Sequence, residues 1–399
     1  MNNIFGFFIG SSALSLLGIE VFHITLPLLV LALGFSPIEV SWCIFSFFLP
    51  VIIVKVASST FIEKGSKIKT LKIGEFGRLF IAFSLALILF LSKELNLVFI
   101  VSISFFFGVF TVFTEVAEPV VLKSLLNNKQ STSALSTYEI RTRSVQLLAP
   151  VLCGFLISIN LFTPYLIVGI ISIFSLFLLS KIKIQESLSK DKNKIYLKDD
   201  VSYAIKWLKK NKLFSLMIML TSINNLLHPV LYLSVIFSLS EKNAGFEVTG
   251  LILSGLGVGG IVGSLMSKKL IDNIPLRTIV LYVNIFRVAI FSGFIIIDSP
   301  IGIFSLFVLK AILGGVWNVS YNIFTIKEMP LELAARISAI SGTLIKLSAG
   351  AGSLGAGYML SLMGIETTII VLVIFTLFML LCSFMYKDEY TRFERECLK

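Results

Sequence analysis

The sequence has few charged residues and few of the residues that carry chemistry in water. Only 14% of its 399 residues are charged, against about 25% in an ordinary soluble domain. It contains two histidines, and its four cysteines show no C-x-x-C spacing typical of a zinc or redox site. It also lacks the G-x-x-x-x-G-K-[ST], H-E-x-x-H and G-x-S-x-G patterns. We therefore expect no enzyme, no bound metal, no cofactor and no direct use of ATP.

Apolar residues are abundant instead. They make up 56% of the chain, and the mean hydropathy is +0.95. The apolar runs are continuous and do not alternate as the strands of a membrane barrel do, and a spanning helix needs about 20 such residues. The sequence predicts an all-α polytopic membrane protein with twelve transmembrane helices. Their predicted limits are 4–33, 38–61, 73–92, 95–120, 133–157, 160–180, 214–239, 247–267, 276–297, 300–325, 335–360 and 366–386.

One long polar stretch, 181–212, divides the chain into six spans and six spans. It holds ten Lys and Arg against four Asp and Glu. The segment DDVSYAIKWLKKNK within it has helical spacing with a basic face, which fits an amphipathic helix on the membrane surface or a solvated linker. The predicted domains are an N-terminal bundle (1–180), a basic cytoplasmic linker (181–213), a C-terminal bundle (214–386) and a cytoplasmic tail (387–399).

The basic residues predict the orientation. With the N-terminus in the cytoplasm, the odd-numbered loops contain only Lys93 and Lys242 of the 34 Lys and Arg. Lys55, Lys310 and Lys346 fall within spans, which leaves 29 at or near the cytoplasmic side. The positive-inside rule therefore predicts a cell-membrane (plasma or inner) protein with both termini cytoplasmic. The net charge of +11 then matches anionic lipid headgroups, and we expect no nucleic-acid partner.

An internal repeat accompanies this division. An offset of 204 residues relates Ser59 to Gly263 and brings His23 next to His228. EFGRLF in the third span is echoed by NIFRVA in the ninth, and APVLCGFLI in the fifth by GSLGAGYML in the eleventh. Parallel repeats of this kind occur in secondary transporters, with the substrate site between the halves.

The twelve spans, the basic central loop and these motifs resemble the major facilitator superfamily over nearly the whole chain. LLGIEVFHITLPLLVLALGFSPIEVSW in the first third is similar to the drug and siderophore exporter branch, which includes macrolide efflux proteins. The resemblance implies two six-helix bundles that alternate access to a central cavity lined by helices one, four, seven and ten. It also implies that a proton gradient drives transport, with no cofactor.

Two motifs of the resembled family mark candidate gating residues. SSTFIEKGSKIKT is similar to the loop G-x-x-x-D-R-x-x-R-R, with Ser59, Glu63 and Lys64 in place of the glycine, aspartate and arginine. APVLCG resembles the exporter motif G-P-x-x-G-G and retains Pro150 and Gly154. The resemblance implies that these residues take part in gating. We add Arg78, which lies near the cytoplasmic end of the third span, as a further gating candidate.

Carboxylates in the first half are the candidates for proton coupling. Charge within hydrocarbon costs about 2.5–3.5 kcal/mol per residue on insertion scales, so it faces a cavity or a partner. Glu20 and His23 share one helix face, as do Glu115 and Glu118. The alternatives are static hydrogen bonds for the first pair and, for Glu118, an ion pair with Lys123, Arg141 or Arg143.

Candidate substrate-binding residues gather in the second half. Lys310 and Lys346 lie deep in their spans, which favours a ligand with negative charge or internal pairs such as Lys310 with Glu115. Aromatic and amide side chains supply flat faces and hydrogen bonds for an amphipathic ligand. The set is His228, Asn225, Lys310, Trp317, Asn318, Tyr321 and Lys346.

The sequence thus predicts a monomeric, proton-coupled exporter of a small amphipathic compound such as a drug, a macrolide or a siderophore. Two alternatives remain: an importer of a siderophore or nutrient with the same fold, and a lipid flippase or non-transporting membrane partner.

Overall fold

The structure is a computed structural model that describes residues 3–64, 66–92, 95–125, 131–182, 205–330, 334–385 and 390. Side chains at 52, 54–64, 131–136, 268–269, 272, 334–336, 339 and 385 lie outside this description. The described elements are all helical: α1 (Asn3–Ala32), α2 (Pro37–Lys64), α3 (Lys67–Leu91), α4 (Leu97–Leu125), α5 (Ser131–Ile159), α6 (Thr163–Ser180), α8 (Lys212–Glu241), α9 (Phe246–Asn273), α10 (Leu276–Ile296), α11 (Pro300–Glu328) and α12 (Ala334–Met385).

The predicted fold class is confirmed. Ten helical stretches of the described chain are long and apolar enough to cross a membrane, and α2 supplies a shorter apolar stretch, Pro37–Val51. The 52 residues of α12 contain one break, at Gly364, whose φ of 77° lies in the left-handed region that favours glycine. Because this break divides α12 into two spans, the described chain has twelve.

Most helix limits match the predicted ones within a few residues, but α3 begins six residues before its predicted start, and α4 and α9 end five and six residues after their predicted ends at 120 and 267. The first turn of α3 is polar, so hydropathy places the start at position 73, whereas the helix starts at Lys67. The Ser66 hydroxyl accepts a hydrogen bond from the backbone N–H of Lys69 at 3.3 Å. This side-chain cap satisfies one of the free N–H groups at the helix start, a signal that apolar periodicity does not carry.

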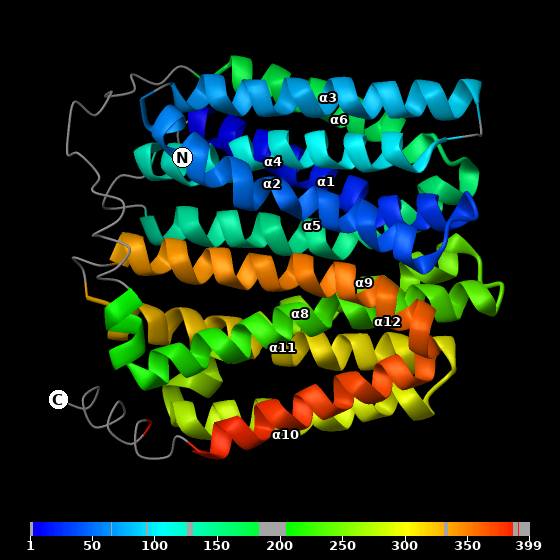
Figure 1. Cartoon of the computed structure of the whole chain (residues 1–399). Coiled ribbons are helices and arrows are strands. Elements are labelled where there is room, and N and C mark those ends of the chain that lie inside the picture. The colour runs from blue at the N-terminus through cyan, green and yellow to red at the C-terminus, as the bar shows by residue number, and fades with distance from the viewer. Residues whose placement is uncertain are drawn as a thin grey trace. The chain divides into compact units, whose positions relative to one another are not determined.

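The chain forms two compact units, one of residues 1–191 with 239–254 and the other of 192–238 with 255–399. In the first unit α1 packs on α5 and α6, α4 packs on α2 and α3, and α3 also contacts α6 (Figure 1). In the second unit α10 packs on α11 and α12 (Figure 1). Of the predicted amphipathic segment, residues 205–210 are helical, and the Trp207 ring contacts the edge of Phe214 at 5.1 Å between ring centroids.

Candidate functional site

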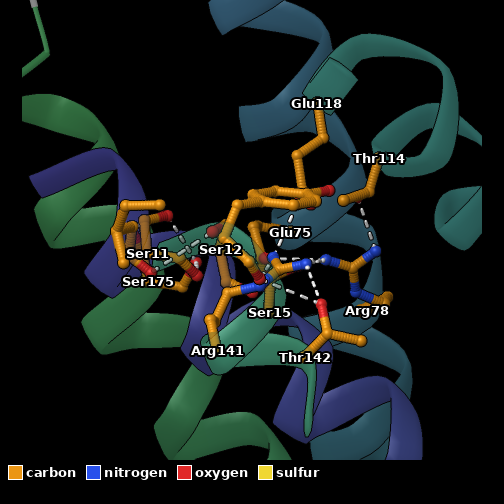
Figure 2. A network of polar contacts seen from close by, with 12 residues as sticks. Ser11, Ser12, Ser15, Glu75, Arg78, Thr114, Glu118, Arg141, Thr142 and Ser175 are labelled. Atoms are coloured by element: carbon orange, nitrogen blue, oxygen red, sulfur yellow. Dashed lines mark hydrogen bonds and ion pairs between the residues drawn. The ribbon is translucent and has the colours of Figure 1, made fainter. Parts of the chain in front are cut away.

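A buried arginine joins three helices in the first unit. The Arg78 guanidinium of α3 donates to the Glu75 carboxylate at 2.6 Å, to the Ser15 hydroxyl of α1 at 2.7 Å and to the Thr114 hydroxyl of α4 at 2.7 Å (Figure 2). The side chains of Arg78 and Glu75 are 1% and 2% exposed. Because an unpaired charge at this depth is costly, Glu75 neutralises Arg78 within one turn of the same helix.

A second ion pair connects α4 and α5. The Arg141 guanidinium donates to the Glu118 carboxylate at 2.6 Å and to the Ser12 carbonyl of α1 at 3.0 Å (Figure 2). The Tyr138 hydroxyl donates to the same Glu118 oxygen at 2.7 Å, and the Arg141 guanidinium lies 4.1 Å from the Tyr138 ring centroid. Of the arrangements expected for Glu118, the structure therefore has the ion pair with Arg141.

Serines of α1 complete this network. Ser11 and Ser175 of α6 lie with their hydroxyl oxygens 2.9 Å apart (Figure 2). Small polar residues let spanning helices approach closely and share hydrogen bonds. The positions of Ser11 and Ser15, one turn apart, are the sequence signal that could have identified this face of α1. The network is charge-balanced and fastens α1 to α3, α4, α5 and α6, so its main effect is structural.

Glu20 and His23 lie in the middle of α1 on one helix face, and no hydrogen bond joins them in the described part of the chain. Both are half-buried. Among the residues described here, the Glu20 carboxylate has neither a hydrogen bond nor an ion pair. His23 packs against two phenylalanine rings. Its ring centroid lies 5.2 Å from that of Phe47 and 5.5 Å from that of Phe48. Glu20 is thus a half-buried carboxylate near the middle of α1 with no hydrogen bond or ion pair among the described residues.

The other predicted residues of the first unit are placed as follows. Glu115 is half-buried in α4. Ser59, Glu63 and Lys64 belong to the last turns of α2, and their side chains lie outside the described residues. The roles assigned to these four residues therefore stay predictions.

Pro150 and Gly154 of α5 form a tight helix crossing within the first unit. A Cβ atom added at Gly154 would lie 2.6 Å from the carbonyl oxygen of Phe246 and 3.0 Å from the Cα of Gly250, both in α9. A Cβ atom added at Gly250 would lie 2.6 Å from the Pro150 carbonyl oxygen. The two backbones touch here because neither glycine has a side chain, so this crossing depends on the residues that the exporter-like motif retains.

We expect Gly154→Ala to weaken this crossing. The added methyl group meets backbone atoms that cannot rotate away, and such overpacking costs roughly 1–3 kcal/mol. Thermal unfolding of the purified protein measures the loss. The matched control is Gly355→Ala in α12, where an added Cβ meets nothing within 4 Å. Equal stabilities of the two variants would show that the close approach is not required.

In the second unit Lys310 and His228 meet. The Lys310 Nζ of α11 lies 2.7 Å from the His228 Nδ1 of α8. Two turns after Lys310 on α11 and two turns before His228 on α8, the Trp317 indole N–H donates to the Thr221 hydroxyl at 3.0 Å. The spacing of seven residues on each helix aligns the two contacts on facing sides. The structure thus brings together two predicted binding residues, Lys310 and His228, and adds Thr221, which the sequence did not single out.

The remaining predicted binding residues are more dispersed. The Asn225 amide donates to the Thr221 carbonyl of its own helix at 2.9 Å. Trp317 is fully buried, Asn318 is exposed, and Tyr321 and Lys346 are half-buried.

Arg287 is a further buried cation of the second unit. Its guanidinium lies 5.5 Å from the Trp317 ring centroid, a cation–π contact. It donates to the Asn284 amide oxygen at 2.5 Å and contacts the Met379 sulfur at 3.9 Å. The Asn284 amide in turn donates to the Ser383 hydroxyl at 2.8 Å. In the described part of the chain neither Arg287 nor Lys310 is ion-paired.

Comparison with known proteins shows which family and which solved structures the chain resembles. Residues 8–353 match the sequence profile of the Major Facilitator Superfamily. No curated protein sequence matches the chain. Similar solved structures include a bacterial homologue of the human lysosomal transporter Spinster (TM-score 0.76, 10% identity, 98% of each chain covered). A D-xylose–proton symporter is also similar, with a TM-score of 0.75, 13% sequence identity, and 98% of this chain and 99% of that chain covered. A bacterial homologue of the iron transporter ferroportin has a TM-score of 0.74 and 14% sequence identity, with 97% of this chain and 99% of that chain covered.

Proposed function

The chain belongs to the Major Facilitator Superfamily, and from this premise we propose that it is a secondary active transporter that exports a small amphipathic compound in exchange for protons. It works by alternating access in the cell membrane, as a monomer with both termini in the cytoplasm and without a cofactor. The proton gradient is the energy source.

Glu20 carries the proposal. Its carboxylate is half-buried near the middle of α1, about 25 Å along a helix of about 45 Å, and it has no partner among the described residues. A carboxylate at this depth is cheaper to hold protonated than ionised. Glu20 therefore takes up a proton from outside, and substrate entering from the cytoplasm displaces it.

The other carboxylates of the first unit have assigned partners or other roles. Glu75 and Glu118 are fixed by arginines, so their protonation would break the network that fastens α1. Glu115 and His23 assist Glu20 in the proposed exchange, and Pro150, Gly154, Ser59, Glu63 and Lys64 are proposed to act in the conformational change.

Proteoliposomes with an acidic lumen test the direction of transport. Exchange with protons concentrates the compound in the acidic lumen, whereas co-transport with protons excludes it. The probes are a macrolide, a catecholate siderophore and pyrenebutyrate, and protein-free vesicles correct for passive partitioning. We expect at least one probe to accumulate in the acidic lumen. Exclusion of a probe that the protein moves would instead support the importer.

A further inference from the structure

The two units differ in how the charges within their spans are balanced. In the first unit Glu75 and Glu118 are paired with Arg78 and Arg141, and Glu20 and Glu115 also lie within spans. Among the described residues of the second unit, Asp and Glu lie at or near helix ends or beside the break of α12 at Gly364, whereas Arg287, Lys310 and Lys346 lie within spans. The second unit therefore has an excess of positive charge at membrane depth.

The internal repeat shows where this excess arises. EFGR in α3 corresponds to NIFR in α10, so Asn284 stands where the first unit has Glu75, and Arg287 corresponds to Arg78. Both arginines are buried, at 1% and 4% exposure. Arg78 bonds to a carboxylate, but Arg287 bonds to the neutral Asn284 amide. Among the described residues, the second unit thus has the buried cation without the carboxylate that balances it in the first unit.

Lys310 is a second cation with no ion pair in the part of the chain that the structure describes. Its contact with His228 satisfies one of the three ammonium donors and supplies no negative charge. Lys310 is seven residues before Trp317, about 10 Å along α11, and Arg287 covers the Trp317 ring. Arg287 and Lys310 carry the same charge, so repulsion acts between them. An anion at Lys310 would relieve this repulsion and gain two ammonium donors.

We propose that Lys310 and His228 bind the anionic group of an amphipathic substrate, and that Arg287 strengthens this binding through its positive field. The inference rests on the proposed transport function and gives its substrate a charge. Carboxylates and phosphates suit the site because they accept several charge-assisted hydrogen bonds at once. Among the compounds considered above, acidic siderophores fit this chemistry better than cationic macrolides.

Binding of a matched pair of probes tests the site. Pyrenebutyrate and its uncharged amide share ring and chain and differ in the carboxylate. The full-length protein in phosphatidylcholine nanodiscs is titrated with each probe, with empty nanodiscs as the blank. We expect pyrenebutyrate to bind at least about ten-fold more tightly than the amide, the factor that corresponds to one good charge-assisted contact.

Variants assign this preference to residues. Lys310→Gln removes the preference for pyrenebutyrate, whereas Lys310→Arg retains it. Asn284→Glu recreates the ion pair of the first unit and lowers pyrenebutyrate affinity by roughly three- to ten-fold, because the field of Arg287 is cancelled. Lys242→Gln, at an exposed position between spans, removes one positive charge elsewhere and leaves both affinities unchanged.

The outcomes separate this inference from the proposed function. Equal binding of both probes, binding of neither, or a preference that survives Lys310→Gln overturns the anion site. Proton-driven movement of a macrolide in the same preparation would then leave the transport function standing. If phosphatidylglycerol added to the nanodiscs competes with pyrenebutyrate, the natural anion is a lipid headgroup. If phosphatidylglycerol does not compete, the natural anion is a diffusible compound. Either result supports the site.

Discussion

Glu20→Gln is expected to abolish transport driven by a pH gradient while the protein stays folded in the membrane. Glutamine has the shape of a protonated glutamate but cannot release a proton. Because Glu20 has no ion pair among the described residues, no partner charge is left unbalanced. We expect at least about a hundred-fold loss of gradient-driven flux, a size typical of removing a positioned proton-transfer group. Uptake into proteoliposomes with an acidic lumen measures it.

The control for this variant is Glu247→Gln, an exposed carboxylate in the first turn of α9. It should transport at the unaltered rate. Exchange of probe between the two sides without a gradient should persist in Glu20→Gln, because that process requires no net proton movement. Full gradient-driven flux in Glu20→Gln would remove Glu20 from the coupling mechanism.

Arg78→Leu is expected to destabilise the first unit strongly. The substitution leaves the Glu75 carboxylate buried at 2% exposure without its cation, and one of its oxygens, Oε2, already lacks a hydrogen-bond partner. Removing one member of a buried ion pair costs about 3–5 kcal/mol. Unfolding of the purified protein by heat or by added denaturing detergent measures the loss, and Glu75→Gln combined with Arg78→Leu should restore much of it.

The repeat provides the matched comparison. Arg287→Leu removes the corresponding buried arginine of the second unit, but Asn284 beside it is neutral, so no charge is stranded. We therefore expect this substitution to cost far less than Arg78→Leu, or even to stabilise the unit. Equal losses in the two variants would contradict the assignment of Arg287 as a cation without an internal counter-ion.

The sequence was sufficient for the fold because membrane spans are set by local composition. Each run of about 20 apolar residues must satisfy its own backbone hydrogen bonds as a helix, so long runs predicted nearly every limit. The late predicted start of α3 has a local cause that hydropathy does not register, because Ser66 starts this helix with a side-chain cap. The break of α12 at Gly364 falls between the predicted limits 360 and 366.

The candidate site was less predictable because its contacts join distant positions. From the sequence, Arg141 was one of three possible partners of Glu118, because several basic residues lie near Glu118 in the chain. Lys310 with His228, 82 positions apart, required the packing of α8 on α11. Ser15 and Thr114 look like ordinary small residues of a span in the sequence. Only the structure shows that the Arg78 guanidinium lies between their hydroxyl groups.

Proton counterflow tests the account most directly. Proteoliposomes that contain a pH-sensitive dye receive an outside excess of a transported probe at equal pH. The account predicts that the lumen becomes more alkaline as the probe enters, because each entry drives protons outward, and that Glu20→Gln shows no such change. Probe entry with an unchanged or more acidic lumen would contradict it.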